Sequence, residues 1–175
     1  MRRNVTLRRV ICNEWNDLPM TRPALAIAVI MERRQVESRW VTHEWRAAGV
    51  ELADAEGDMV ETVGGSQFQR HAGFEIVLFR DEAEGYYLNS ATGEPKVFVM
   101  WRQEDGETAP VPHSVTASYN EAARWMDAQE HVDAVAMPAA MAVWLDDYVA
   151  ANYKPEPKKK RVKISFLAPR DKASL

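Results

Sequence analysis

The residues able to bind a metal or act as a nucleophile are scattered along this chain. Its 4 histidines form no H-x-x-x-H or H-E-x-x-H pair, and its one cysteine, Cys12, has no C-x-x-C partner. A zinc-type site would need ligands that converge from distant segments. The G-x-S-x-G spacing of a serine nucleophile and the G-K-[ST] end of a phosphate loop are also absent. We predict no catalytic residue and no metal site, and we assign no cofactor and no cofactor-binding residue.

Pairs of carboxylates are frequent, but their surroundings argue against acid–base catalysis. Residues 81–84 and 104–105 fall in predicted turns, and Asp146 and Asp147 lie on the polar side of a predicted helix. General acid–base catalysis needs one carboxylate of a pair to be desolvated, so that its pKa rises toward neutrality. Solvated pairs do not meet that requirement. We therefore expect a protein that is not an enzyme.

One segment combines arginine with tryptophan, two residue types that dominate protein interfaces. These residues are interspersed with glutamates, so two interpretations stay open. One is a partner-binding surface; the other is a strand pair whose tryptophans fill the core and whose arginines pair with neighbouring glutamates. As candidate partner-binding residues we take Arg33, Arg34, Arg39, Trp40 and Trp45.

Charge is segregated along the chain. Residues 24–153 hold nine basic and 22 acidic residues, a net charge of −13, whereas residues 1–23 carry +3 and residues 154–175 carry +6. Such segregation favours docking of the basic tail on an acidic protein surface. Nucleic acid is a less suitable partner, because the acidic body would repel a polyanion. The candidate tail residues are Lys158, Lys159, Lys160 and Arg161.

Hydropathy predicts no membrane span. The longest apolar run, residues 24–31, is far shorter than the ~20 residues that a spanning helix requires. The arginine-rich start resembles the charged region of a signal peptide, but Glu14 and Asp17 interrupt the apolar stretch that should follow. A lone cysteine also rules out an intramolecular disulfide. We expect a cytoplasmic protein.

These candidates must be positioned by a folded domain, and the pattern of the chain predicts an α+β domain over residues 24–153. Alternating apolar residues predict strands at 24–31, 40–50, 74–80, 85–89, 96–102 and 111–117. The short turns between them favour antiparallel pairing in one curved sheet or open barrel of about six strands. Residues 54–67, with Gly57 and the pair Gly64 and Gly65, are predicted to be a mobile loop.

Two helices are predicted after the strands. Ser118 and Glu121 have the spacing of a capping box, in which the serine hydroxyl caps the helix and the glutamate reaches back. The second helix covers residues 138–152, with an apolar stripe at helical spacing. The basic segments 1–23 and 154–175 are predicted to be flexible tails. Residues 1–23 alternate only weakly, at Val5 and Leu7, and the charge-rich ends are candidate guards of the sheet edges.

Three blocks of the sequence, residues 27–45, 79–102 and 118–161, resemble in order and spacing a bacterial domain family of unknown function. The genes of that family tend to lie beside those of molybdenum-dependent formate dehydrogenase. The resemblance implies no catalytic residue, and it implies a protein partner, a subunit of formate dehydrogenase. Together with the charge segregation, it favours a non-catalytic accessory subunit or assembly factor of that enzyme.

A second hypothesis is a ligand-binding carrier or chaperone for the molybdenum cofactor or formate. Both ligands are anionic, so this function needs arginines that converge on a concave pocket. The candidate residues for such a pocket are Arg80, Arg102 and Arg124.

Overall fold

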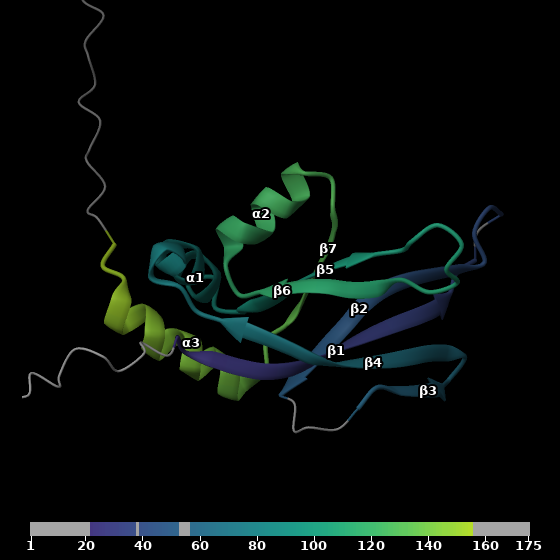
Figure 1. The fold of residues 1–175 in the computed structure, drawn as a ribbon, viewed down its shortest axis with the longest axis horizontal. Coiled ribbons are helices and arrows are strands. Elements are labelled where there is room, and N and C mark those ends of the chain that lie inside the picture. Colours follow the sequence, from purple (N-terminus) through teal and green to yellow (C-terminus); the bar gives the residue numbers. More distant parts are fainter. Residues whose placement is uncertain (1–21, 38, 53–56, 156–175) are drawn as a thin grey trace, which may run out of the picture.

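The computed structural model describes residues 22–37, 39–52 and 57–155 (Figure 1). These residues form β1 (Ala24–Gln35), β2 (His43–Leu52), β3 (Met59–Val63), β4 (Ser66–Val77), η1 (Arg80–Glu82), α1 (Ala83–Ser90), β5 (Lys96–Arg102), β6 (Val111–Thr116), α2 (Tyr119–Asp127), β7 (His131–Ala136) and α3 (Ala139–Asn152). Most of the two predicted tails, including Lys158, Lys159, Lys160 and Arg161, lies outside the described residues. No helix in the described ranges is long and apolar enough to cross a membrane.

The strands form two antiparallel sheets that pack face to face. Sheet A has the strand order β2-β1-β4-β3, and sheet B has the order β6-β5-β7. In Figure 1 sheet B lies over sheet A, α2 lies beyond sheet B, and α1 and α3 lie together at one end. Contacts of β2 with β7 and of β4 with β6 join the two sheets. On one face of sheet A the residues Ala26, Arg46, Glu51, Met59 and Glu61 are exposed, so the described residues leave much of this face open.

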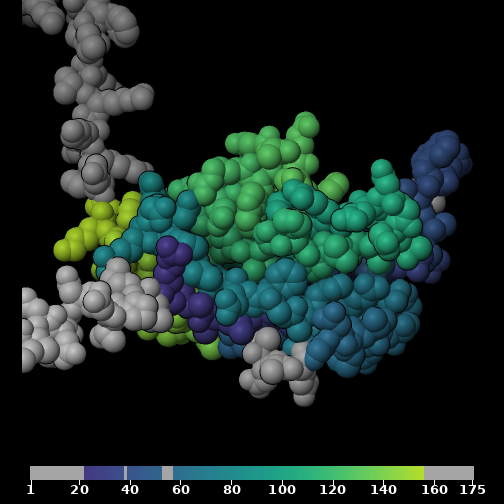
Figure 2. All heavy atoms as spheres, viewed as in Figure 1, coloured from purple at the N-terminus to yellow at the C-terminus, as the bar shows by residue number. Residues whose placement is uncertain are grey.

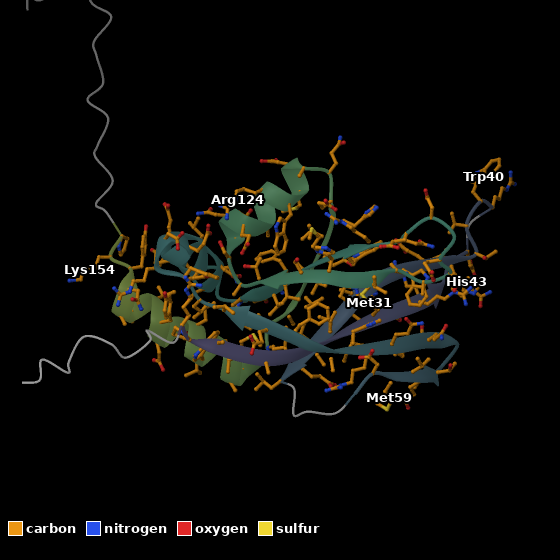
Figure 3. The ribbon with its side chains drawn as sticks, viewed as in Figure 1. Met31, Trp40, His43, Met59, Arg124 and Lys154 are labelled. Atoms are coloured by element: carbon orange, nitrogen blue, oxygen red, sulfur yellow. The ribbon has the colours of Figure 1, made fainter. Side chains whose placement is uncertain are left out.

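The core lies between the sheets. Ile27, Val29 and Met31 alternate along β1 and are fully buried, as are Val97 and Val99 of β5. Figure 3 shows Met31 between the sheets. Because side chains two apart on a strand share a face, this alternation leaves Ile30 and Glu32 on the other face of sheet A. The buried residues of α3 join the same core and are Met141, Leu145 and Val149.

A β-bulge and one carboxylate connect the two sheets. Ile30 pairs with Gly49 but Met31 pairs with Ala47, so Ala48 is an extra residue in β2. The Ala47 N–H donates to the Asp133 Oδ2 of β7 at 2.7 Å. The same oxygen accepts the Trp101 Nε1–H of β5 at 2.8 Å. Asp133 therefore joins the backbone of sheet A to a side chain of sheet B.

The α+β class and the antiparallel pairing are confirmed, but the arrangement differs from a single sheet. The described residues contain seven strands in two sheets, with no closed barrel. The two predicted C-terminal helices are α2 and α3, but β7, which was not predicted, lies between them. The chain reaches β7 through Gln129, whose φ of 63° is the left-handed conformation that commonly ends a helix.

The predicted strand at residues 85–89 is wrong, because these residues belong to α1. Tyr86 and Asn89 are three residues apart and both are buried, which is a helical spacing. The Tyr86 ring packs edge-on against Tyr148 of α3, with 5.9 Å between the ring centroids. The sequence alternates too briefly here to separate a short helix from a strand.

The predicted loop at 54–67 is also largely wrong. Residues 59–63 and 66–67 belong to β3 and β4, which form a hairpin. Gly64 and Gly65 make its two-residue turn with φ values of 58° and 88°. Two positive φ values suit glycine and match the twist of a hairpin.

Of the two hydrogen bonds of the capping box predicted for α2, one is present. The Ser118 Oγ accepts the Glu121 N–H at 3.1 Å, as a capping serine should. Glu121 does not reach back to the Ser118 N–H, which donates instead to the Thr116 Oγ1 at 3.0 Å. The Thr116 hydroxyl in turn donates to the Glu121 Oε2 at 2.5 Å. A threonine thus mediates the return contact.

Asn89 fastens α1 to the ends of β5 and β6. Its side chain is 1% exposed. The Nδ2 donates to the carbonyls of Lys96 at 2.7 Å and Ala117 at 2.8 Å. The Oδ1 accepts the Lys96 N–H at 2.9 Å. All three partners are backbone groups that would otherwise lie unpaired at the ends of strands.

Candidate functional site

The structure divides the predicted partner-binding residues among three places. Arg33 and Trp45 are directly opposite each other and lie on the inner face of sheet A, the face of Met31. Trp45 is half-buried and packs against the core. Arg39 and Trp40 lie in the connection from β1 to β2, which forms a projection at one end of the molecule (Figures 2 and 3). Only Arg34 lies on the uncovered outer face.

The arginines of the outer face are paired with glutamates across strands. Arg34 Nη2 lies 2.8 Å from Glu44 Oε2, and Arg46 Nη2 lies 2.6 Å from Glu32 Oε2. For these two arginines and for Trp45, the interpretation as an ordinary strand pair is confirmed. The five residues therefore do not form one interface patch.

A shallow groove crosses the same outer face. Its cavity volume is about 330 Å³. In the register of sheet A, Gly49, Ile30, Arg70 and Met59 stand in one row across all four strands. The next row contains Arg46, Glu32, Phe68 and Glu61. The groove is lined by Ile30, Ala48, Gly49, Glu51, Met59, Glu61, Phe68 and Arg70.

The groove has an apolar floor with charges around it. Burial raises the pKa of Glu32, but hydrogen bonds from Arg46 and Ser66 outweigh burial and hold that pKa below its usual value. Arg70 Nε lies 3.4 Å from Glu51 Oε2, and its Nη1 donates to the Gly57 carbonyl at 2.9 Å. These ion pairs place charged groups next to Ile30 and Phe68. Such a surface, apolar in the middle and polar at its rim, is what a protein partner binds.

Sequence reasoning missed most of this groove. Met59 and Glu61 lie in the segment predicted to be a loop, and Phe68 comes directly after it. The signal was present: Met59, Glu61 and Val63 alternate with Val60 and Thr62 before two glycines, which is typical of a hairpin. The position of Ala48 could not be predicted, because a bulge leaves no clear trace in a single sequence.

The polar cluster between α1 and α2 is the other candidate site. The Ser118 hydroxyl is fully buried and donates to Glu82 Oε2 at 2.6 Å. Arg124 Nη2 lies 2.6 Å from the second oxygen, Glu82 Oε1. Burial raises the pKa of Glu82, but hydrogen bonds from Ser118 and Arg124 hold it below its usual value. A serine that is buried and already caps a helix is a structural residue, not a nucleophile.

Histidines do not gather with acidic residues or cysteine in the described ranges. No group of three or more His, Cys, Asp or Glu side chains there is placed to hold a metal ion. His131 instead stacks on Trp101, with ring centroids 4.7 Å apart and an interplanar angle of 11°. His113 lies beside Ser114, with 3.1 Å between its Nδ1 and the hydroxyl oxygen.

His71 is expected to make the fold sensitive to acid. Its Nε2 is buried with no hydrogen-bond partner among the described residues. Burial lowers the pKa of His71, although Asp58 opposes this. Protonation therefore favours the unfolded chain, whose histidine has a pKa of about 6.5. His71 therefore does not change the stability of the fold above that pH, and it lowers the free energy of unfolding as the pH falls below it. Urea titrations between pH 8 and 5 should show a shallower loss of stability for His71→Leu than for wild type.

The matched control for this experiment is His113→Leu, because His113 is exposed. This variant should keep the acid sensitivity of the wild type. An equal change of slope in the two variants would contradict the assignment to His71.

A comparison with family models identifies the relatives of this chain. The model described as "Protein of unknown function (DUF3305)" matches residues 26–162, most of the chain. The chain belongs to the DUF3305 family. No curated protein and no solved structure matches it. The DUF3305 match covers nearly the same residues as the predicted resemblance, while its description names no enzyme. The association with formate dehydrogenase therefore stays a prediction.

Proposed function

We propose that this DUF3305 protein is a non-catalytic docking protein that binds its partner through the outer face of sheet A. The observation that carries the proposal is the groove, whose apolar floor at Ile30 and Phe68 lies on the face of sheet A where Arg46, Glu51 and Glu61 are exposed. The arginines of this face are already paired with glutamates: Arg34 with Glu44, Arg46 with Glu32, and Arg70 with Glu51. Preformed pairs reduce the entropy lost when a partner binds.

The partner that we propose is a subunit of a molybdenum-dependent formate dehydrogenase, with this chain acting as an accessory subunit or assembly factor. The resemblance described from the sequence supports this choice. The acidic body and the basic residues Lys158, Lys159, Lys160 and Arg161 support a second contact through the tail. We also propose that the protein acts in the cytoplasm, where such a maturing enzyme subunit would be met.

The carrier hypothesis has less support. Arg102 is bound in a two-point contact to Glu130, and Arg124 is bound to Glu82. They come from β5 and α2, and each carries its own carboxylate partner. An anionic ligand would have to displace both pairs, and the groove of sheet A is not lined by Arg80, Arg102 or Arg124.

The proposal is tested by binding of purified full-length chain to a purified molybdenum-dependent formate dehydrogenase at low salt. Ala48 is an exposed residue that lines the groove. Ala48→Arg would place a long charged side chain in the interface, so we expect binding about tenfold weaker or worse. Calorimetry or biosensor titration gives the dissociation constants.

The control is Ala150→Arg, at an exposed alanine of α3 that does not line the groove. This variant should bind like wild type. Absence of wild-type binding to both the mature enzyme and its cofactor-free form would refute the partner. Equal loss in the two variants would refute the groove as the docking site.

A further inference from the structure

Strand β3 is an edge of sheet A that no described element covers. All five of its residues are exposed, among them Met59 at 57%, Val60 at 61% and Val63 at 54%. On one side β3 pairs with β4; its other side offers a row of backbone N–H and C=O groups. Natural edges are usually protected by proline, lysine or a covering segment, and β3 contains neither residue. An exposed apolar edge of this kind readily pairs with a further strand.

We propose that residues 7–11 of this chain form a fifth strand of sheet A, antiparallel to β3. The sequence there is Leu-Arg-Arg-Val-Ile, and it lies outside the described residues. With Arg9 opposite Glu61, the remaining pairs are Leu7 with Val63, Arg8 with Thr62, Val10 with Val60 and Ile11 with Met59. Every apolar residue of β3 then meets an apolar residue. The carboxylate of Glu61, which lines the groove, meets a guanidinium.

The direction of the chain suits this pairing. In sheet A, β1 is antiparallel to β4 and β4 is antiparallel to β3, so β1 and β3 run the same way. A strand antiparallel to β3 therefore ends on the side where β1 begins. The start of β1 is fixed there, because the Pro23 carbonyl accepts the Leu78 N–H at 2.9 Å.

The connection is also long enough. Ile11 would pair with Met59, and Met59 lies in the same row across the sheet as Ile30 of β1. Ile30 is seven residues after Pro23, so the two rows are roughly 23 Å apart along the strand direction. Three strand spacings from β1 to the new strand add roughly 14 Å across the sheet. The straight separation is thus about 27 Å, whereas the eleven residues 12–22 reach roughly 37 Å when extended. The link is therefore long enough to span this separation.

A second copy of the chain fits this edge less well. Two β3 strands paired antiparallel about their central residue would place Glu61 opposite Glu61, and like charges directly opposite are destabilising. Residues 7–11 would instead place Arg9 opposite Glu61, and opposite charges in such a pair are stabilising. This inference does not depend on the proposed partner, because it concerns only the chain's own edge.

The test is a disulfide between the proposed neighbours. In full-length protein carrying Cys12→Ser, Val10→Cys and Val60→Cys would place two cysteines opposite each other. Directly opposed Cα atoms lie about 4.5–5.5 Å apart, within the range of a disulfide. Mild oxidation followed by peptide mass spectrometry should find this bond within one chain. The matched control is Val10→Cys with Val143→Cys, since Val143 on α3 is 62% exposed against 61% for Val60.

The expected result is an intramolecular bond that forms about tenfold faster, or more, for the Val60 pair than for the Val143 pair. Arg9→Glu should slow that bond, and adding Glu61→Arg should restore its rate. A bond only between two chains would assign the edge to a second copy and overturn the proposal. Equal rates for the two pairs, no bond, or no recovery with the exchanged charges would overturn it as well. None of these outcomes depends on formate dehydrogenase.

Discussion

Replacing Asn89 with alanine is expected to lower the free energy of unfolding by about 4 kcal/mol, because three buried backbone groups lose their partners. These groups are the Lys96 N–H and the carbonyls of Lys96 and Ala117. Alanine can neither donate nor accept, and at 1% exposure little water can reach the site. A whole domain is stable by only about 5–15 kcal/mol, so this change removes a large fraction.

Urea denaturation at neutral pH measures this loss, and a conservative control is available in α3. Asn152 also donates through its Nδ2 to a backbone carbonyl, that of Tyr148, but Asn152 is exposed. Asn152→Ala should cost about 0.5 kcal/mol or less, because water replaces the lost hydrogen bond. A similar loss in the two variants would show that the buried network of Asn89 is not what holds α1 to the strands.

Gly85→Ala is expected to destabilise the fold by about 3 kcal/mol, although alanine is the better helix former by about 1 kcal/mol. A Cβ on Gly85 would lie 2.2 Å from the Ser118 Oγ and 3.2 Å from the Asn120 nitrogen. Ser118 cannot move aside cheaply, because its hydroxyl caps α2 and also donates to Glu82. Overpacking combined with loss of the cap therefore outweighs the gain in helix propensity.

A double-mutant cycle with Ser118→Ala tests this explanation. Removing the hydroxyl costs the cap, about 1 kcal/mol, but it also removes the atom that clashes. The double variant should therefore lose clearly less stability than the sum of the two single losses. Gly49→Ala, where an added Cβ meets nothing within 4 Å, should leave stability nearly unchanged. Additive losses at Gly85 and Ser118 would rule out the clash.

The parts of the fold that follow from local rules could be predicted from the sequence. Helix α2 begins at the predicted cap Ser118, and α3 buries part of the predicted stripe, including Met141 and Leu145. The prediction of a strand at α1 is wrong because the helix is short and buries residues on several sides. Its apolar residues therefore do not recur at the 3.6-residue spacing that identifies a helix. Its identity is set by tertiary partners such as Tyr148.

The candidate site was predictable in residue type but not in place. Arginine with glutamate on neighbouring strands predicts ion pairs, and the pairs of Arg34 and Arg46 exist. Which face each residue occupies depends on strand register, and a shift of one residue reverses every side chain. The bulge at Ala48 makes such a local shift in β2. Arg33 and Arg34 lie on opposite faces of the sheet for a simpler reason, because successive side chains of one strand alternate between its faces.

The carboxylate of Asp133 has a consequence for how this domain unfolds. It accepts one hydrogen bond from each sheet, from the Ala47 N–H of β2 in sheet A and from the Trp101 Nε1–H of β5 in sheet B. Separating the sheets would remove the Ala47 N–H from this carboxylate, whereas Trp101 belongs to the same sheet as Asp133 and would stay. A half-open state would therefore leave a part-buried anion short of one donor, with no compensating contact. Amide exchange in β2 and β7 should therefore proceed through one shared opening event, with both strands in a single cooperative unit.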